Sequence, residues 1–111
     1  MPPLRQTAGI AGLGRFAEPA VLILVSLAGG DKHGYAINAD IERFSGLSLG
    51  AGTLYGAVAR LEERGLIEAL PAADRRHPYH LTAEGAAALE AQARRLQRIG
   101  TTALDRLVRS G

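Results

Sequence analysis

The chain has 111 residues, of which 47% are apolar, so we expect one domain with a modest core. It contains no cysteine, which excludes disulfides, thiolate metal sites and cysteine nucleophiles. Its 13 basic and 11 acidic side chains leave a net charge of +2, which by itself is weak support for nucleic-acid binding.

Nothing near the N-terminus has the continuous apolar stretch of a signal peptide, because Pro, Gly and polar residues interrupt it. The longest apolar run, residues 20–28, is less than half of the ~20 residues that a membrane-spanning helix requires. We therefore expect a soluble, cytoplasmic protein. Residues 1–17 show no clear period and are interpreted as a flexible N-terminal arm, which assembly would order in part. The alternative is that this segment extends the first helix.

Two short helices are predicted next. Over residues 18–28 an acid and a proline stand at the start and two glycines follow the end, which is typical of a buried helix. Over residues 34–44, Ile37, Ile41 and Phe44 recur at i, i+4 and i+7, which predicts one apolar helix face.

A third helix is predicted over residues 51–64. Leu54, Val58 and Leu61 give it one apolar stripe, and Gly65 follows it where a left-handed cap is wanted. The stripe predicts which side of this helix is buried.

The opposite side of this third helix carries Thr53, Gly56, Arg60 and Arg64, at 100° per residue. It is small and polar near the start and basic toward the end. We expect Gly52 to allow a tight turn before the helix, because glycine tolerates a positive φ.

A β-hairpin is predicted after the third helix. Residues 66–70 and 79–82 are two short segments around a polar, proline-bounded loop, which holds the basic pair Arg75 and Arg76. The last helix is expected to begin at Thr82 or just after it, where a threonine cap precedes an acid, and to continue almost to the end of the chain.

The last helix carries an apolar seam whose members are spaced alternately by four and three residues, as in a coiled coil. They are Leu89, Ala93, Leu96, Gly100, Ala103 and Leu107. A domain of this size has little core left for such a face to cover, so we interpret the seam as a dimer interface. The alternative is that the stripe packs only on its own domain.

The order of these elements is that of a winged helix-turn-helix, a mainly α fold with a small β-hairpin wing (α+β). We divide the chain into the arm (1–17), the winged domain (18–82) and the C-terminal dimerisation helix (83–111). In this fold the second helix of the turn unit enters the major groove of DNA. Arginines there can reach a guanine edge or a phosphate.

Several short motifs occur in the order and spacing of one known family. They are HGYAI at 33–37, GTLY at 52–55, RLE at 60–62, GLI at 65–67 and YHLT at 79–82. Through them the chain resembles the PadR family of bacterial transcriptional regulators over about residues 20–85. It is similar to the short subgroup, because one long helix ends it.

The resemblance implies a homodimeric repressor that binds double-stranded operator DNA, with a C-terminal helix that exchanges contacts with its partner. It supports Thr53, Tyr55 and Arg60 as DNA-binding residues, with Tyr55 available to a phosphate. It also supports Arg75 and Arg76 beside the minor groove.

Two features depart from the family pattern. Gly56 stands where many members have proline, which costs up to ~1 kcal/mol of helix propensity relative to alanine but would let the backbone approach DNA more closely. In the hairpin loop the family commonly carries a basic residue and an aromatic one, and here residues 76–79 (RHPY) replace them, so the basic residue of the loop tip is displaced. Some members of the subgroup bind a flat apolar compound between protomers, and the small seam residues fit either such an effector or plain close packing.

Other classes of function find little support. His77 and His80 with Asp74 lack a fourth ligand for a tetrahedral metal site, and no nucleophile motif or phosphate loop is present, so we expect no enzyme activity and no cofactor. A winged helix that binds another protein remains an alternative, because the fold does not dictate nucleic-acid binding. A partner surface should show large exposed apolar groups on the third helix.

Overall fold

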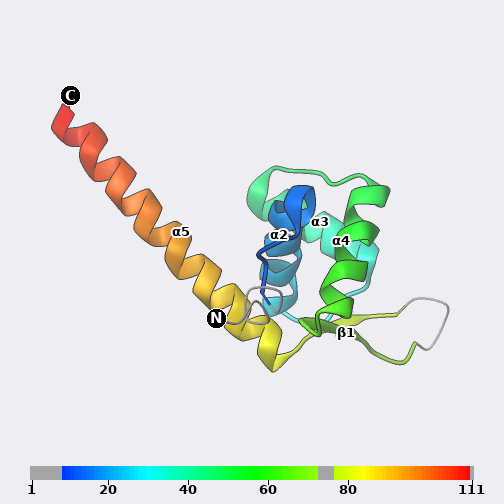
Figure 1. Cartoon of the computed structure of the whole chain (residues 1–111). Coiled ribbons are helices and arrows are strands. Elements are labelled where there is room, and N and C mark those ends of the chain that lie inside the picture. Colours follow the sequence, from blue (N-terminus) through cyan, green and yellow to red (C-terminus); the bar gives the residue numbers. More distant parts are fainter. Residues whose placement is uncertain (1–8, 73–76, 111) are drawn as a thin grey trace.

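Helix α2 (Ala17–Ala28) is the central element of the domain, and the other elements pack around it. The computed structural model describes residues 9–72 and 77–110 (Figure 1). The remaining elements are a short 3-10 helix, three α-helices and two strands. They are η1 (Gly14–Phe16), α3 (Gly34–Ser45), α4 (Ala51–Glu63), β1 (Ile67–Ala69), β2 (Tyr79–Leu81) and α5 (Ala83–Ser110).

The core is built from the apolar faces of α2, α3 and α4. Ala20, Ile23 and Leu24 of α2 are completely buried, as are Ile37 and Ile41 of α3. The stripe predicted for the third helix is also confirmed, since each of its three members is buried. The domain is thus a three-helix core with a hairpin beside it, and the expected mainly α winged-helix fold is confirmed.

Phe44 differs from the expectation for the second helix. Its side chain is 45% exposed, although its spacing from Ile37 and Ile41 placed it on the apolar face. It lies in the last turn of α3, before Gly46 adopts a left-handed conformation and the chain turns away from the core. The core therefore covers the first two positions of the apolar face and leaves Phe44, the third, partly exposed.

The segment expected to be a flexible arm is ordered from residue 9 onward. Leu13 and Phe16 are buried in the core, and the turn that holds them leads into α2 without a break. These residues therefore form part of the folded domain, which the sequence did not reveal because a single pair of apolar side chains is too short to give a periodic signal. Residues 1–8 lie outside the described part of the chain.

Two side chains hold the turn between α3 and α4: the Ser45 hydroxyl accepts from the N–H of Leu47 at 3.0 Å, and Asn38 bridges to Leu49. The amide group of Asn38 donates to the carbonyl of Leu49 at 2.8 Å and accepts from its N–H at 3.1 Å. The positive φ of this turn falls on Gly46 (φ 76°), not on Gly52, which lies inside α4. The conformational role expected for Gly52 was therefore wrong.

Strands β1 and β2 pair antiparallel and form the predicted hairpin, with Ile67 opposite Leu81. A further bridge joins Lys32 to Tyr79 through two backbone hydrogen bonds, so the loop before α3 extends the small sheet. This bridge ties the hairpin to the helical part of the domain.

Thr82 caps α5 as predicted. Its hydroxyl donates to the carbonyl of Gly65 at 2.7 Å and accepts from the N–H of Gly85 at 3.0 Å. Ala88 and Leu89 then pack against the core, and beyond them α5 leaves the domain as a single projecting helix (Figure 1). At ~1.5 Å per residue its length far exceeds the domain surface that it touches. None of the helices in 9–72 and 77–110 is long and apolar enough to cross a membrane.

We predict that Gly85→Ala lowers the free energy of unfolding by about 1–3 kcal/mol. A Cβ at this position would overlap the carbonyl oxygen of Leu66, which is backbone and cannot rotate away. Gly52→Ala is the matched control, because its Cβ would meet open space and should raise stability by up to ~1 kcal/mol. Urea unfolding followed by circular dichroism measures both, and equal midpoints for the two variants would contradict the prediction.

Candidate nucleic-acid interface

Helix α4 presents its uncovered side to solvent at the front of the domain. Thr53, Tyr55, Ala59 and Arg60 are exposed on it, opposite the buried apolar stripe. The residues nearest its N-terminus are small, so another molecule could approach the backbone closely. Of the four residues predicted on this side, Thr53 and Arg60 are exposed, whereas Gly56 and Arg64 are half-buried.

Tyr55 forms one edge of this face. Its ring lies against Gly34 of α3, where a Cβ would overlap the phenol, yet the side chain is still 50% exposed. Together with Tyr35 it lines a shallow groove of about 300 Å³ between α3 and α4. Tyr35, at 78% exposed, was not selected from the sequence, because a lone aromatic at a helix start gives no functional signal.

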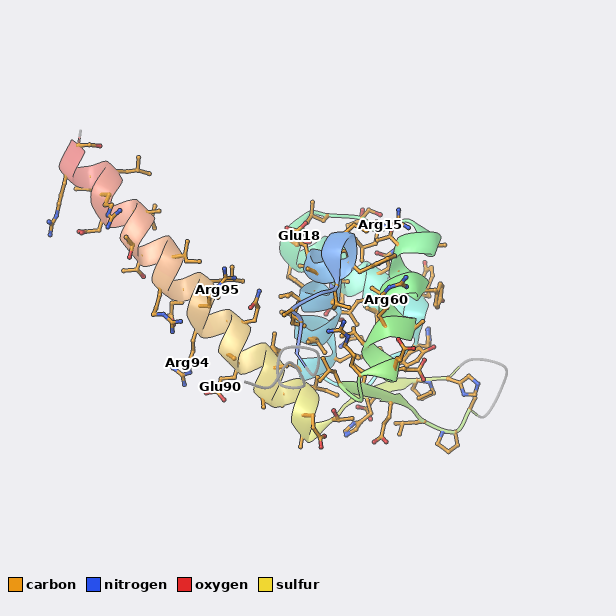
Figure 2. The ribbon with its side chains drawn as sticks, viewed as in Figure 1. Arg15, Glu18, Arg60, Glu90, Arg94 and Arg95 are labelled. Atoms are coloured by element: carbon orange, nitrogen blue, oxygen red, sulfur yellow. The ribbon has the colours of Figure 1, made fainter. Side chains whose placement is uncertain are left out.

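Arg60 forms the other edge. Its guanidinium lies 3.9 Å from the centroid of the Phe16 ring and donates to the carbonyl of Gly56 at 2.9 Å. Figure 2 shows the side chain lying along α4 toward η1. It remains exposed, so its charge is available to an anion on this side of the helix.

Gly56 has a structural role that differs from the one expected. A Cβ here would lie 2.8 Å from Cε1 of Phe16, which is closer than van der Waals contact allows. Glycine is therefore required for Phe16 to reach α4. The residue is half-buried, so close approach to DNA is not needed to explain it.

Arg64 differs most from its expected place. Its guanidinium donates to the carbonyls of Gly9 at 2.9 Å and Ala11 at 2.7 Å. The charge thus holds the N-terminal segment against the end of α4, and we leave Arg64 out of the proposed DNA-binding surface. Arg75 and Arg76 lie outside the described residues, so their DNA-binding role stays a prediction from the sequence.

The hairpin contributes a titratable pair. His80 of β2 and Asp31, in the loop before α3, are joined at 2.8 Å. The hydrogen bond to the Asp31 carboxylate, with a smaller contribution from Glu68, raises the pKa of His80 above its usual 6.5. No cluster of three potential metal ligands occurs within 9–72 and 77–110.

The match to a family model decides the identity of the chain. Residues 23–91 match the model described as the transcriptional regulator PadR-like family. The chain belongs to this family. The family consists of transcriptional regulators, and the matched residues run from α2 through the turn, α4 and the hairpin into α5.

Individual relatives agree with this assignment. A PadR family transcription regulator from hypervirulent Clostridium difficile is 29% identical, with a TM-score of 0.72, and the match covers 79% of this chain and 96% of that one. A transcriptional regulator from Clostridium thermocellum is 27% identical, with a TM-score of 0.69 and coverage of 78% and 86%.

A third relative is known from its sequence. It is an uncharacterized 37.1 kDa protein of a Streptomyces fradiae transposon, 46% identical over 85 residues, which are 77% of this chain. The match spans 25% of that relative's length. The similarity therefore concerns the PadR-like part and not the whole of the larger protein.

We predict that Asp31→Asn lowers the pKa of His80 toward its usual value, because the variant removes the carboxylate that stabilises the imidazolium. Titration of His80 by NMR measures the shift. Since the folded-state pKa is raised, the pair stabilises the fold below the usual histidine pKa, and this contribution is lost as the pH rises through the raised value. An unchanged titration curve in the variant would contradict the pairing.

Proposed function

We propose that this PadR-family protein is a homodimeric repressor that binds operator DNA with sequence specificity, with α4 in the major groove. The observation that carries the proposal is the exposed face of α4. It begins directly after the turn, is small at its N-terminal end, and is bordered by Tyr55 on one side and Arg60 on the other. A helix that inserts into a groove about 12 Å wide needs such a narrow, polar-edged face.

Thr53 and the backbone around Gly52 would lie nearest the base edges, because they are exposed in the first turn of α4. The hydroxyl of Tyr55 would donate to a phosphate, and Arg60 would supply charge on the opposite edge. Arg75 and Arg76 would bring the hairpin loop to the minor groove. Because the net charge is only +2, the positions of these basic side chains matter more for DNA affinity than the total charge of the chain.

The dimer would form along α5. Leu96 and Leu107 of the seam are 50% and 66% exposed, and the exposed Ile99, Leu104 and Val108 widen the apolar face. Leu89 alone of the seam packs on its own core, so intradomain packing accounts for the start of the stripe and leaves the rest uncovered. A second copy would cover it, and a two-fold axis would place two α4 helices about one DNA turn apart, ~34 Å.

An apolar effector would enter this seam where its residues are smallest, at Ala93, Gly100 and Ala103. Gly100 has open space around it, which a partner helix or a flat compound could fill. If an effector bound in the seam changed the angle between protomers, it would change the spacing of the two α4 helices and so weaken DNA binding.

A protein-binding winged helix is the competing function. It would use the same face of α4, whose one large apolar group is the half-exposed Tyr55 at the edge. The rest of the face offers little apolar area to a protein partner. The surface therefore favours nucleic acid.

The proposed function is tested by fluorescence anisotropy with a duplex from upstream of the protein's own gene and a scrambled duplex, each at two salt concentrations. We expect tighter binding to the upstream duplex and a steep loss of affinity as salt rises. Equal affinity for both duplexes would refute sequence-specific binding. Absence of binding to either would favour a protein partner.

We predict that Leu96→Glu converts the dimer to a monomer, because two carboxylates would meet in an apolar seam. Thr102→Glu adds the same charge on the same helix but outside the seam, and should leave the dimer intact. Sedimentation equilibrium gives the mass of each variant. A dimeric Leu96→Glu protein would refute the seam.

A further inference from the structure

Two arginines from distant parts of the chain meet on one aromatic ring. The guanidinium carbon of Arg60, in α4, lies 3.9 Å from the centroid of Phe16, and that of Arg15, in η1, lies 5.0 Å from it. Both distances are within the range of a cation–π interaction. Figure 2 shows the two side chains on the same side of the domain, beside α4.

Neither guanidinium is neutralised by the protein within the described residues. The ion pairs found there involve other basic groups, and Glu18, the acid nearest to Arg15 in the sequence, is not paired with it. Both arginines are exposed. An anion that both guanidiniums can reach would therefore be stabilised by both charges.

The space beside the ring is open and already polar. A groove of about 450 Å³ is lined by Arg15, Phe16, Gly52 and Thr53. It therefore runs from Arg15 and the Phe16 ring, on which Arg60 also lies, to the first turn of α4, whose N-terminus has no side-chain cap. Free amides and the Thr53 hydroxyl add hydrogen-bond donors on the far side of the same groove.

We propose that Arg15 and Arg60, held on the Phe16 ring, form a binding site for one phosphate of the DNA backbone next to α4. A guanidinium presents a planar fork that matches phosphate oxygens, and two forks can share one phosphate from different sides. Phe16 is a positioning residue, since its ring orients both cations without touching the DNA. Gly56 is required as well, because a side chain there would displace the ring.

This inference rests on the proposed DNA binding and makes it more specific. It assigns Arg60 to the backbone and not to a base, and it adds Arg15, which the sequence had placed in a flexible arm. Recognition of bases is then left to the first turn of α4 and its exposed small face.

The test compares Arg15→Ala, Arg60→Ala and the double variant with Arg98→Ala, which removes an exposed arginine from α5. Anisotropy with the upstream and scrambled duplexes is measured over a salt series. We expect each single variant to lose about tenfold in affinity for both duplexes alike, the order of one charge-assisted hydrogen bond. The salt slope should fall by about 0.9 for each phosphate that the protein no longer neutralises.

Because both arginines contact one phosphate, their effects should be coupled, so the loss in the double variant should differ from the sum of the two single losses. Arg98→Ala should bind as the parent does. Phe16→Leu keeps both charges but removes the ring, so it should reproduce the loss, and Phe16→Tyr should restore binding. Thermal unfolding of each variant confirms that it is folded, and the two exposed arginine variants carry the test if Phe16→Leu does not fold.

Two outcomes would overturn the site. In the first, Arg15→Ala binds DNA with the same affinity as Arg98→Ala. In the second, Arg60→Ala loses affinity for the upstream duplex but not for the scrambled one. A parent with no preference between duplexes would refute sequence specificity, yet the salt slopes would still test the site. If the parent binds no DNA, titration with inorganic phosphate at constant ionic strength tests whether the two arginines bind a phosphate group. Shifts of the Nε–H NMR signals of both Arg15 and Arg60 would support the site, and unchanged signals would overturn it.

Discussion

Burial of α2 is the interaction on which the rest of this structure depends. The helix is apolar around most of its circumference, and Ala20, Ile23 and Leu24 have no exposed surface. In so short a chain, this can be achieved only if α3, α4, η1 and the start of α5 all pack on the same helix. Each of these elements turns its apolar face inward, which leaves the outer face of α4 free for another molecule.

The same constraint explains why α5 extends away from the domain. Once Ala88 and Leu89 have packed against the core, no apolar surface of the domain remains near the helix, although the helix continues for some twenty residues at ~1.5 Å each. Its stripe stays exposed and must be covered by something outside the protomer. The proposed DNA-binding surface on α4 and the proposed dimer seam on α5 thus lie on different elements of the fold.

The N-terminal segment links the core to the proposed DNA-binding surface. Leu13 and Phe16 fill the core beside α4, Arg64 ties the preceding backbone to the end of that helix, and Gly56 leaves room for the Phe16 ring. As a result, the position of Arg60 depends on a residue far away in the sequence. A change in this segment could alter DNA affinity without altering α4 itself.

Local sequence was sufficient to predict the helices, the hairpin and the winged-helix class. The stripe of Leu54, Val58 and Leu61, the left-handed Gly65 and the Thr82 cap each act within a few residues, so periodicity and capping chemistry reveal them. The exposed position of Thr53 followed from the same helical period, whereas Tyr55 was named only through the family resemblance.

Interactions between distant residues were decided only by the tertiary structure. Phe16 on Gly56, Arg64 on Gly9, and Asp31 on His80 join segments that lie far apart in the chain. Such pairs leave no periodic trace in the sequence, because each member satisfies its local rules without the other. Arg64 has the spacing of a DNA-reading residue and binds the chain's own backbone, since helical period fixes the direction of a side chain but not the partner that it meets.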